Sequence, residues 1–247
     1  MKVIIEGLMT EYLRSGKNGA PTLLFLHGWG SNAAVFKGLI DNLEKDFDVV
    51  ALNFPGFSGT DQPPQVWDVQ DYADWTEKFI EKAGLKEIHA IVGHSFGGRV
   101  MLKGISNSKF RAEKLIFMDT SGVKPRLDTR GKTIKLMARM SRILPSSLRA
   151  KVGQKFASTD YKNLQGDPIM RQTFQNIVNE DLTSAMPLVK QPSLLIWGAD
   201  DTETPPADAK VFATKILHSQ LEIIDQAGHY VFLDQPEKVL KLIKEFL

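Results

Sequence analysis

One serine of this chain stands between glycines directly after an apolar run. Gly93, His94, Ser95, Phe96 and Gly97 match the pattern G-x-S-x-G. In that pattern the serine occupies the apex of a sharp turn from a strand to a helix, with its hydroxyl exposed. Such a turn strains the serine backbone, and side chains at the glycine positions would collide with the neighbouring strand and helix. Because helical spacing follows the turn, we interpret Ser95 as a nucleophile rather than as part of a glycine-rich turn that only packs a helix.

A serine hydroxyl is a weak nucleophile unless a base lies within hydrogen-bonding distance. The chain has five histidines, which are His27, His89, His94, His218 and His229. His89 and His218 lie at the wrong ends of predicted strands, and His94 adjoins Ser95 on the wrong side of the turn. This leaves His27 and His229. Since His229 follows the final predicted strand in a loop that can reach Ser95, we predict that it is the base rather than a histidine that caps a turn.

An acid is needed to orient the histidine ring through its second nitrogen. The segment IWGADDTETPP places Asp200 and Asp201 after a predicted strand, and Asp119 follows another strand in FMDTSG. For Asp119 the preferred interpretation is a hydrogen bond to the turn after its strand. With any of the three aspartates, the chain order is serine, acid, histidine, which is the order of one fold in particular.

Six short apolar runs alternate with segments of helical spacing, which indicates a mostly parallel sheet covered by helices. The runs span residues 22–28, 48–56, 88–95, 114–122, 193–201 and 221–229. Because each run is continuously apolar, each is expected to form a strand buried on both faces. Each run ends in Gly, Asp, Ser or His, at the sheet edge where open parallel sheets bind their ligands. The predicted fold class is therefore α/β, with a mostly parallel, doubly wound central sheet.

One long segment interrupts this alternation. Between residues 123 and 187 the strand signal disappears, while the apolar spacing of residues 134–144 predicts a helix. A loop of this length without structure of its own is rare in a compact domain. We therefore predict a core of residues 1–122 and 188–247, with residues 123–187 inserted as a helical cap over one end of the sheet. Residues 1–15 are expected to add one or two edge strands.

The composition limits the function classes. Hydrophobic residues make up 43% of the chain and charged residues 24%, as in ordinary globular proteins. There is no cysteine, which excludes disulfides, thiol nucleophiles and thiolate metal sites. No segment approaches the roughly 20 apolar residues of a membrane span, and the N-terminus lacks the apolar length of a signal peptide. A cytoplasmic location is expected, with no cofactor, no metal and no nucleic-acid partner.

Basic residues gather in one window, although the net charge is only +2. Between Asp128 and Asp160 the chain has eight basic residues and no acidic one. Four of them follow helical spacing and form one stripe, which consists of Lys132, Lys135, Arg139 and Arg142. The simpler interpretation is a solvated helix face. The alternative is a cap that attracts an acidic partner or an anionic surface to the mouth of the site.

The chain resembles the α/β-hydrolase fold superfamily, in the branch with a helical cap inserted after the sixth strand. The resemblance covers nearly the whole chain, through LLFLHGWGSN, VGHSFGG, LLIWGADDTETP and AGHYVFLDQPE. In the family pattern W-G-x-x-D-x-x-x-P the fifth position is the acid, which implies Asp201 rather than Asp200. The resemblance also implies an oxyanion hole made by the backbone N–H groups of Trp29 and Phe96, with His27 as a structural residue that holds the loop of Trp29.

These residues together imply two-step acyl transfer through an acyl-enzyme on Ser95. A serine at this position argues against the haloalkane dehalogenases and epoxide hydrolases, which resemble the chain but use aspartate there. We expect a carboxylesterase, because a bare triad suffices for esters. Small lipases, perhydrolases, amidases and hydrolases of carbon–carbon bonds in dienone acids are the alternatives.

Two further alternatives concern partners. The stretch LHGWGSNAAVF resembles the equivalent part of the methyl esterases that act on pimeloyl groups carried by acyl carrier protein, an acidic partner. Some proteins of this fold act instead as ligand receptors with little turnover.

The segment NFPGFSGTD departs from the pattern of many relatives at Asn53, Ser58 and Thr60, so no narrow subfamily is assigned.

Overall fold

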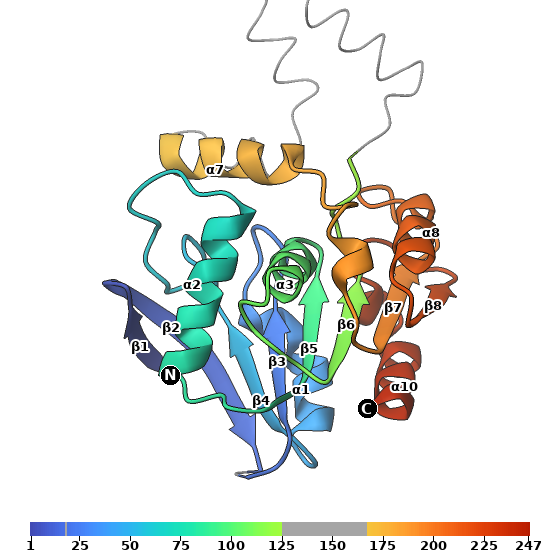
Figure 1. The fold of residues 1–247 in the computed structure, drawn as a ribbon. Helices are drawn as coiled ribbons and strands as arrows, with labels where there is room; N and C mark the ends of the chain where they lie inside the picture. The colour runs from blue at the N-terminus through green and yellow to red at the C-terminus, as the bar shows by residue number, and fades with distance from the viewer. Residues whose placement is uncertain (18, 125–166) are drawn as a thin grey trace, which may run out of the picture.

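The computed structural model describes residues 1–17, 19–124 and 167–247 (Figure 1). The basic stripe and the helix expected over residues 134–144 lie outside the described residues. Residues 167–187, the described end of the expected cap, contribute buried side chains to the core, among them Met170, Ile177 and Met186. The boundary expected near residue 122 stays a prediction.

A single sheet of eight strands forms the centre of the molecule. Its order is β1-β2-β4-β3-β5-β6-β7-β8. The strands are β1 (Lys2–Ile5), β2 (Leu8–Gly16), β3 (Thr22–Leu26), β4 (Asp48–Leu52), β5 (Ile88–His94), β6 (Lys114–Met118), β7 (Ser193–Gly198) and β8 (Ser219–Ile224). All pairs from β4 to β8 are parallel, whereas β1 and β2 pair antiparallel at one edge. The mostly parallel sheet and the extra N-terminal edge strands are thereby confirmed.

Burial along the strands follows the sequence pattern with one exception. Every residue of β3, β4 and β7 is buried, which confirms that these continuous apolar runs are covered on both faces. The same expectation is wrong for β8, where only Ile224 is buried. Because β8 is the last strand of the sheet, one of its sides has no neighbouring strand to cover it.

Helices cover both faces of the sheet (Figure 1). The helices of four or more residues in the described part are η1 (Ala33–Phe36), α1 (Lys37–Leu43), α2 (Val69–Lys82), α3 (Phe96–Ser106), α7 (Pro168–Asn179), α8 (Pro206–Lys215), α9 (Val231–Asp234) and α10 (Pro236–Phe246). Among the described residues, no helix has the length and apolar character needed to cross a membrane.

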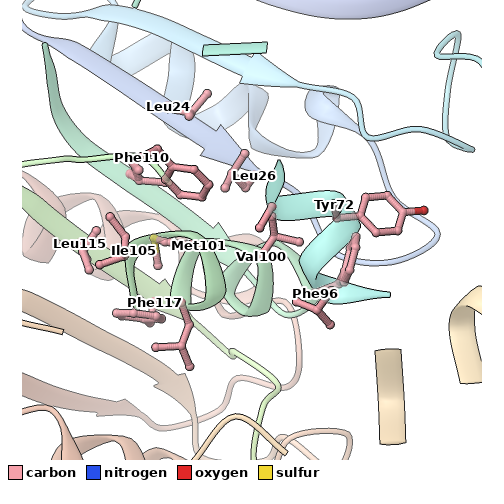
Figure 2. Close-up of a cluster of buried hydrophobic side chains, with 14 of the residues drawn as sticks. Leu24, Leu26, Tyr72, Phe96, Val100, Met101, Ile105, Phe110, Leu115 and Phe117 are labelled. Carbon is pink, nitrogen blue, oxygen red and sulfur yellow. The ribbon is translucent and has the colours of Figure 1, made fainter. Parts of the chain in front are cut away.

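Two hydrophobic cores lie on opposite faces of the sheet. Successive side chains of a strand point to opposite faces, so Leu24 and Leu26 of β3 join the core with α2, α3 and α8. Leu23 and Phe25 join the second core, with α1 and α10. Figure 2 shows part of the first core, in which α3 packs against the strands. The two cores confirm the doubly wound arrangement and hold the strand ends, where the candidate site lies, at fixed positions.

Helix α7 crosses the end of the sheet toward which the parallel strands point (Figure 1). Asp167 caps the helix by accepting a hydrogen bond from the backbone of Met170, and Pro168 occupies the first turn, where no intrahelical donor is needed. Met170 and Ile177 are buried against the core. This helix therefore forms a roof over the carboxyl ends of the strands.

Candidate active site

Ser95 lies in the turn between β5 and α3. Its backbone has φ 50° and ψ −111°, a strained conformation for a residue with a side chain. The N–H of Ser95 donates to the carbonyl of Met118 in β6, at 3.0 Å, which ties the turn to the neighbouring strand. The backbone strain predicted from the sequence is confirmed.

The glycines of this turn are needed because other elements approach it closely. A Cβ at Gly93 would lie 2.7 Å from the Cα of Gly98 in α3. A Cβ at Gly97 would overlap the carbonyl group of Leu26 at the end of β3. The predicted collisions with the neighbouring helix and strand are both confirmed.

A chain of hydrogen bonds joins three residues from three strand ends. The Nε2 atom of His229 lies 3.0 Å from the Oγ atom of Ser95, and its Nδ1 atom lies 2.9 Å from Oδ2 of Asp201. Asp201 follows β7 and His229 follows β8, so the fold brings together residues that are more than 100 positions apart from Ser95. This geometry allows the imidazole to take a proton from the serine hydroxyl while the carboxylate holds the opposite ring nitrogen.

The carboxylate of Asp201 is held in its charged form. Burial opposes that charge, but hydrogen bonds from His229 and Thr204 outweigh burial and lower the pKa of Asp201 below its usual value. The N–H groups of Glu203 and Thr204 both donate to Oδ1, at 2.8 and 3.0 Å. The Thr204 hydroxyl donates to Oδ2 at 2.6 Å.

The pKa of His229 changes in the opposite direction to that of Asp201. Burial alone would lower its pKa, but the nearby carboxylate of Asp201 outweighs burial and raises the pKa above the ordinary value. Glu203 and Asp119 add to this effect. The imidazolium that forms during proton transfer is therefore stabilised by the acidic groups around it.

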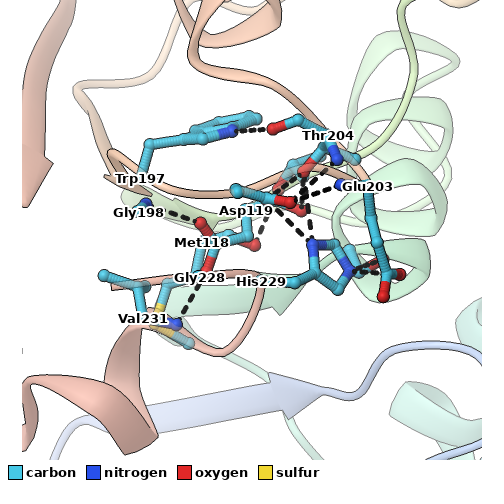
Figure 3. A network of polar contacts seen from close by, with 12 residues as sticks. Met118, Asp119, Trp197, Gly198, Glu203, Thr204, Gly228, His229 and Val231 are labelled. Carbon is cyan, nitrogen blue, oxygen red and sulfur yellow. Dashed lines mark hydrogen bonds and ion pairs between the residues drawn. The ribbon is translucent and has the colours of Figure 1, made fainter. Parts of the chain in front are cut away.

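The other two candidate acids do not contact the His229 ring. Asp200 is exposed, and its N–H donates to the carbonyl of Ala227. Asp119 is fully buried, but its carboxylate accepts hydrogen bonds from the N–H groups of Gly198, at 2.9 Å, and Val231, at 3.0 Å. Instead of binding the turn after its own strand, Asp119 therefore joins the end of β7, just before Asp201, to the start of α9, just after His229 (Figure 3).

His27 holds the loop that contains Trp29. Its Nδ1 atom donates to the carbonyl of Gly28, at 2.7 Å, and its Nε2 atom accepts from the N–H of Phe54, at 3.0 Å. Burial lowers the pKa of His27 to about 4, so the ring is neutral at pH 7. Its structural role agrees with the prediction.

A cavity of about 460 Å³ opens over the hydroxyl of Ser95. Its lining consists of Trp29, Ser95, Phe96, Ser121, Phe174, Ile177, Val178, Glu203, Thr204 and His229. A second cavity of about 640 Å³ adjoins it and shares Ser121, Val178, Glu203 and Thr204 with it. Aromatic and aliphatic side chains from α3, α7 and the Trp29 loop make up half of the residues that line the first cavity, which suits an apolar ligand group beside the polar catalytic side chains.

Trp29 and Phe96 both line this cavity beside Ser95. Phe96 is the first residue of α3, so its N–H belongs to the first turn, where backbone donors have no partner within the helix. The two side chains contact each other edge to face, with ring centroids 5.4 Å apart.

A model of the Alpha/beta hydrolase family matches residues 23–242. The chain belongs to this family. The match includes β3 from Leu23 onward, the strands β4 to β8 and the loops that carry Ser95, Asp201 and His229.

Known relatives of this hydrolase include lipases. The monoacylglycerol lipase abhd6-B of Xenopus laevis is 26% identical over 265 residues, which cover 96% of this chain and 78% of the relative. Among solved structures, a bacterial membrane phospholipase A superposes with a TM-score of 0.79 at 23% identity, over 100% of this chain and 84% of the other. The meta-cleavage product hydrolase CumD of Pseudomonas fluorescens superposes with a TM-score of 0.75 at 19% identity, over 100% and 96%. At these identities the solved structures establish the fold.

In the described part of the hydrolase, no group of three or more His, Cys, Asp or Glu residues is arranged to hold a metal ion. The cluster around His229 is instead an internal hydrogen-bond network (Figure 3).

Two residues of the site were not assigned to it from the sequence. The Nε2 atom of His94 lies 2.8 Å from the backbone carbonyl of His229 and donates to it. Burial lowers the pKa of His94 to about 3, so this donor keeps its neutral form. His94 and Asp119 thus bind the backbone that directly follows the His229 side chain, at the carbonyl of His229 and the N–H of Val231. In the sequence, the available signal for each was a polar residue at the carboxyl end of a predicted strand. The hydrogen-bond partners of His94 and Asp119 could not be predicted, because they depend on how distant segments meet in the fold.

Proposed function

We propose that this hydrolase cleaves carboxylic esters by acyl-enzyme chemistry on Ser95. The observation that carries the proposal is the hydrogen-bonded chain from Ser95 through His229 to Asp201 at a cavity that is partly lined by apolar side chains. A serine activated in this way attacks carbonyl groups, and a triad without a cofactor is sufficient for ester cleavage.

In the proposed reaction, His229 takes the proton of the Ser95 hydroxyl as the oxygen attacks the ester carbonyl. The N–H groups of Trp29 and Phe96 donate to the oxyanion of the tetrahedral intermediate. Each such donor typically contributes about 3 kcal/mol to lowering the barrier. His229 then passes its proton to the leaving alcohol, and the carbonyl of the acyl group stays bound to Ser95.

The second half of the reaction repeats these roles with water. His229 accepts a proton from a water molecule, which attacks the acyl-enzyme, and the same histidine returns the proton to Ser95 as the acid leaves. Asp201 keeps the imidazole in the tautomer that presents Nε2 to Ser95 throughout.

The substrate class is supported by the cavity and by the relatives. Aromatic and aliphatic residues around Ser95 favour an ester with an apolar acyl group. The similarity to proteins named monoacylglycerol lipases supports ester hydrolysis. A second candidate is the hydrolysis of carbon–carbon bonds in dienone acids, which the fold shared with a meta-cleavage product hydrolase supports.

A panel of 4-nitrophenyl esters of rising acyl length, assayed beside a dienone acid, tests the proposal. We expect hydrolysis of the esters by the wild type and its loss in Ser95→Ala. Turnover of the dienone acid alone would replace ester cleavage with the second candidate. Turnover of neither substrate would favour a ligand receptor.

A further inference from the structure

Glu203 projects from the loop that carries Asp201, at the mouth of the site. The backbone N–H of Glu203 donates to Oδ1 of Asp201, at 2.8 Å, so the position of its main chain is fixed relative to the acid. Its side chain is 64% exposed, and its Oε2 atom lies 3.5 Å from Nε2 of His229. Figure 3 shows the side chain of Glu203 beside the ring of His229.

Among the described residues that line the cavity over Ser95, Glu203 is the one with an acidic side chain. It also lines the adjoining cavity. An ester whose acyl group occupies either cavity would therefore lie near the carboxylate of Glu203. Its negative charge lies beside the nitrogen that must exchange a proton with both the serine and the leaving group.

The cations near the second cavity are already close to acidic groups. Arg99 and Lys124 line that cavity, and both lower the pKa of Asp181 through their charge. Asp208 adds a further carboxylate to the same lining. The positive charges of Arg99 and Lys124 thus have negative charges nearby. The negative charge of Glu203 instead faces the reacting atoms.

We infer that Glu203 is a specificity-determining residue that selects esters whose acyl group carries no negative charge, so that neutral and cationic esters are the substrate class. The inference rests on the proposed function. Two like charges about 7 Å apart repel each other. Because the Glu203 side chain is largely exposed, an effective dielectric constant of about 25 to 50 applies, and the repulsion then corresponds to about a 5- to 20-fold change in an equilibrium or rate constant. Dienone acids, which carry a carboxylate, are disfavoured on this ground.

The same carboxylate influences the proton affinity of His229. The groups that face this imidazole are Asp201, Asp119 and Glu203, which are acidic, and His94, which is neutral. Removing the charge of Glu203 leaves fewer negative groups to stabilise the imidazolium. We therefore expect the kcat/KM profile of Glu203→Gln to extend to lower pH than that of the wild type, since the reaction needs the unprotonated imidazole.

A series of esters with matched length and different charge tests the inference. The substrates are 4-nitrophenyl hexanoate, the 4-nitrophenyl monoester of adipic acid and 4-nitrophenyl 6-aminohexanoate, which carry no charge, a negative charge and a positive charge. In Glu203→Gln we expect the ratio of kcat/KM for the anionic ester to that for the neutral ester to rise about 5- to 20-fold at low salt. The ratio for the cationic ester should fall. Both changes should shrink at high salt.

Glu222→Gln is the matched control, because it removes the same charge from an exposed position in β8 that lines neither cavity. It should leave both ratios and the pH profile unchanged. If the esters are hydrolysed but Glu203→Gln has the same ratios as the wild type, this inference is overturned while the proposed function stands. If no ester of any charge is hydrolysed, the proposed function fails and the inference fails with it.

Discussion

At the scale of single residues, Asp119 is the side chain whose removal should most disturb the geometry around His229. Its two carboxylate oxygens accept from the backbone N–H groups of Gly198, at the end of β7, and Val231, at the start of α9. Asparagine can accept from one of these donors, but its NH₂ group then opposes the other donor. We expect Asp119→Asn to lower kcat about 10- to 100-fold with little change in KM, and to reduce stability by about 1–3 kcal/mol.

Asp200→Asn is the matched control, since Asp200 is exposed. Steady-state kinetics with thermal unfolding measures both effects, and wild-type kcat in Asp119→Asn would refute the assignment.

His94 allows a second prediction at this scale, because glutamine can reproduce its Nε2 donor. We expect His94→Gln to retain most of the activity, whereas His94→Leu leaves the carbonyl of His229 without its donor and loses activity by about 10-fold or more. Activity assays on chains with the same far-ultraviolet circular dichroism compare the two variants. Equal activities of the two variants would show that this hydrogen bond does not position the base.

At the scale of secondary structure, Arg99 connects α3 to the roof formed by α7. It is 3% exposed, and its Nη2 atom donates to the carbonyls of Ile177 and Glu180, both at 2.5 Å, at the end of α7. Helix α7 supplies Phe174, Ile177 and Val178 to the cavity over Ser95. We expect Arg99→Met to reduce kcat/KM for long-chain esters about 10-fold more than for an acetate ester, because the roof contacts only the longer chains.

Lys103→Met is the control for this prediction. Lys103 pairs with Glu180 between the same two elements, at 2.7 Å, but it lies outside both cavities. Both side chains of this pair are only partly exposed, at 22% and 26%, and we expect the pair to contribute about 1 kcal/mol. The ratio of activities on long and short esters should therefore stay the same in Lys103→Met. A uniform loss over all chain lengths in Arg99→Met would indicate a general folding defect instead.

The strands of the sheet were predictable because the features that form each strand lie within one short stretch of the sequence. Strands β3, β4 and β7 are read from continuous apolar runs, and the glycines around Ser95 are read from the steric needs of one turn. Edge exposure of β8 was not predictable, since it depends on where the strand lies in the sheet. The contacts of His94 and Asp119 were missed for a related reason, because their partners lie in distant parts of the chain.

At the scale of the whole molecule, buried neutral histidines should make folding stability depend on pH. Burial lowers the pKa of His27 to about 4 and of His94 to about 3, from an ordinary value of 6.5. Unfolding exposes both rings, so below pH 6.5 the unfolded chain binds protons that the folded chain does not, and stability falls as the pH falls toward 4. Asp119 acts in the opposite sense, because burial raises its pKa to about 7 and the folded state binds its proton first.

The variant His94→Gln isolates one of these contributions. Between pH 6 and pH 4, we expect the unfolding free energy of the wild type to decrease more steeply than that of the variant, by about 1.4 kcal/mol per pH unit. Urea unfolding at several pH values measures both slopes. Identical slopes would mean that His94 titrates normally in the folded protein.

The chemical role of Ser95 is the central claim, and covalent labelling with a fluorophosphonate tests it most directly. Such a probe reacts with a serine only when a base activates it and an oxyanion site receives the phosphonyl oxygen. Intact mass spectrometry should show one adduct per wild-type chain, and peptide mapping should assign it to Ser95. No adduct should form on Ser95→Ala, and labelling should be strongly slowed in His229→Ala. An unlabelled wild type, or an adduct that persists in Ser95→Ala, would contradict the account.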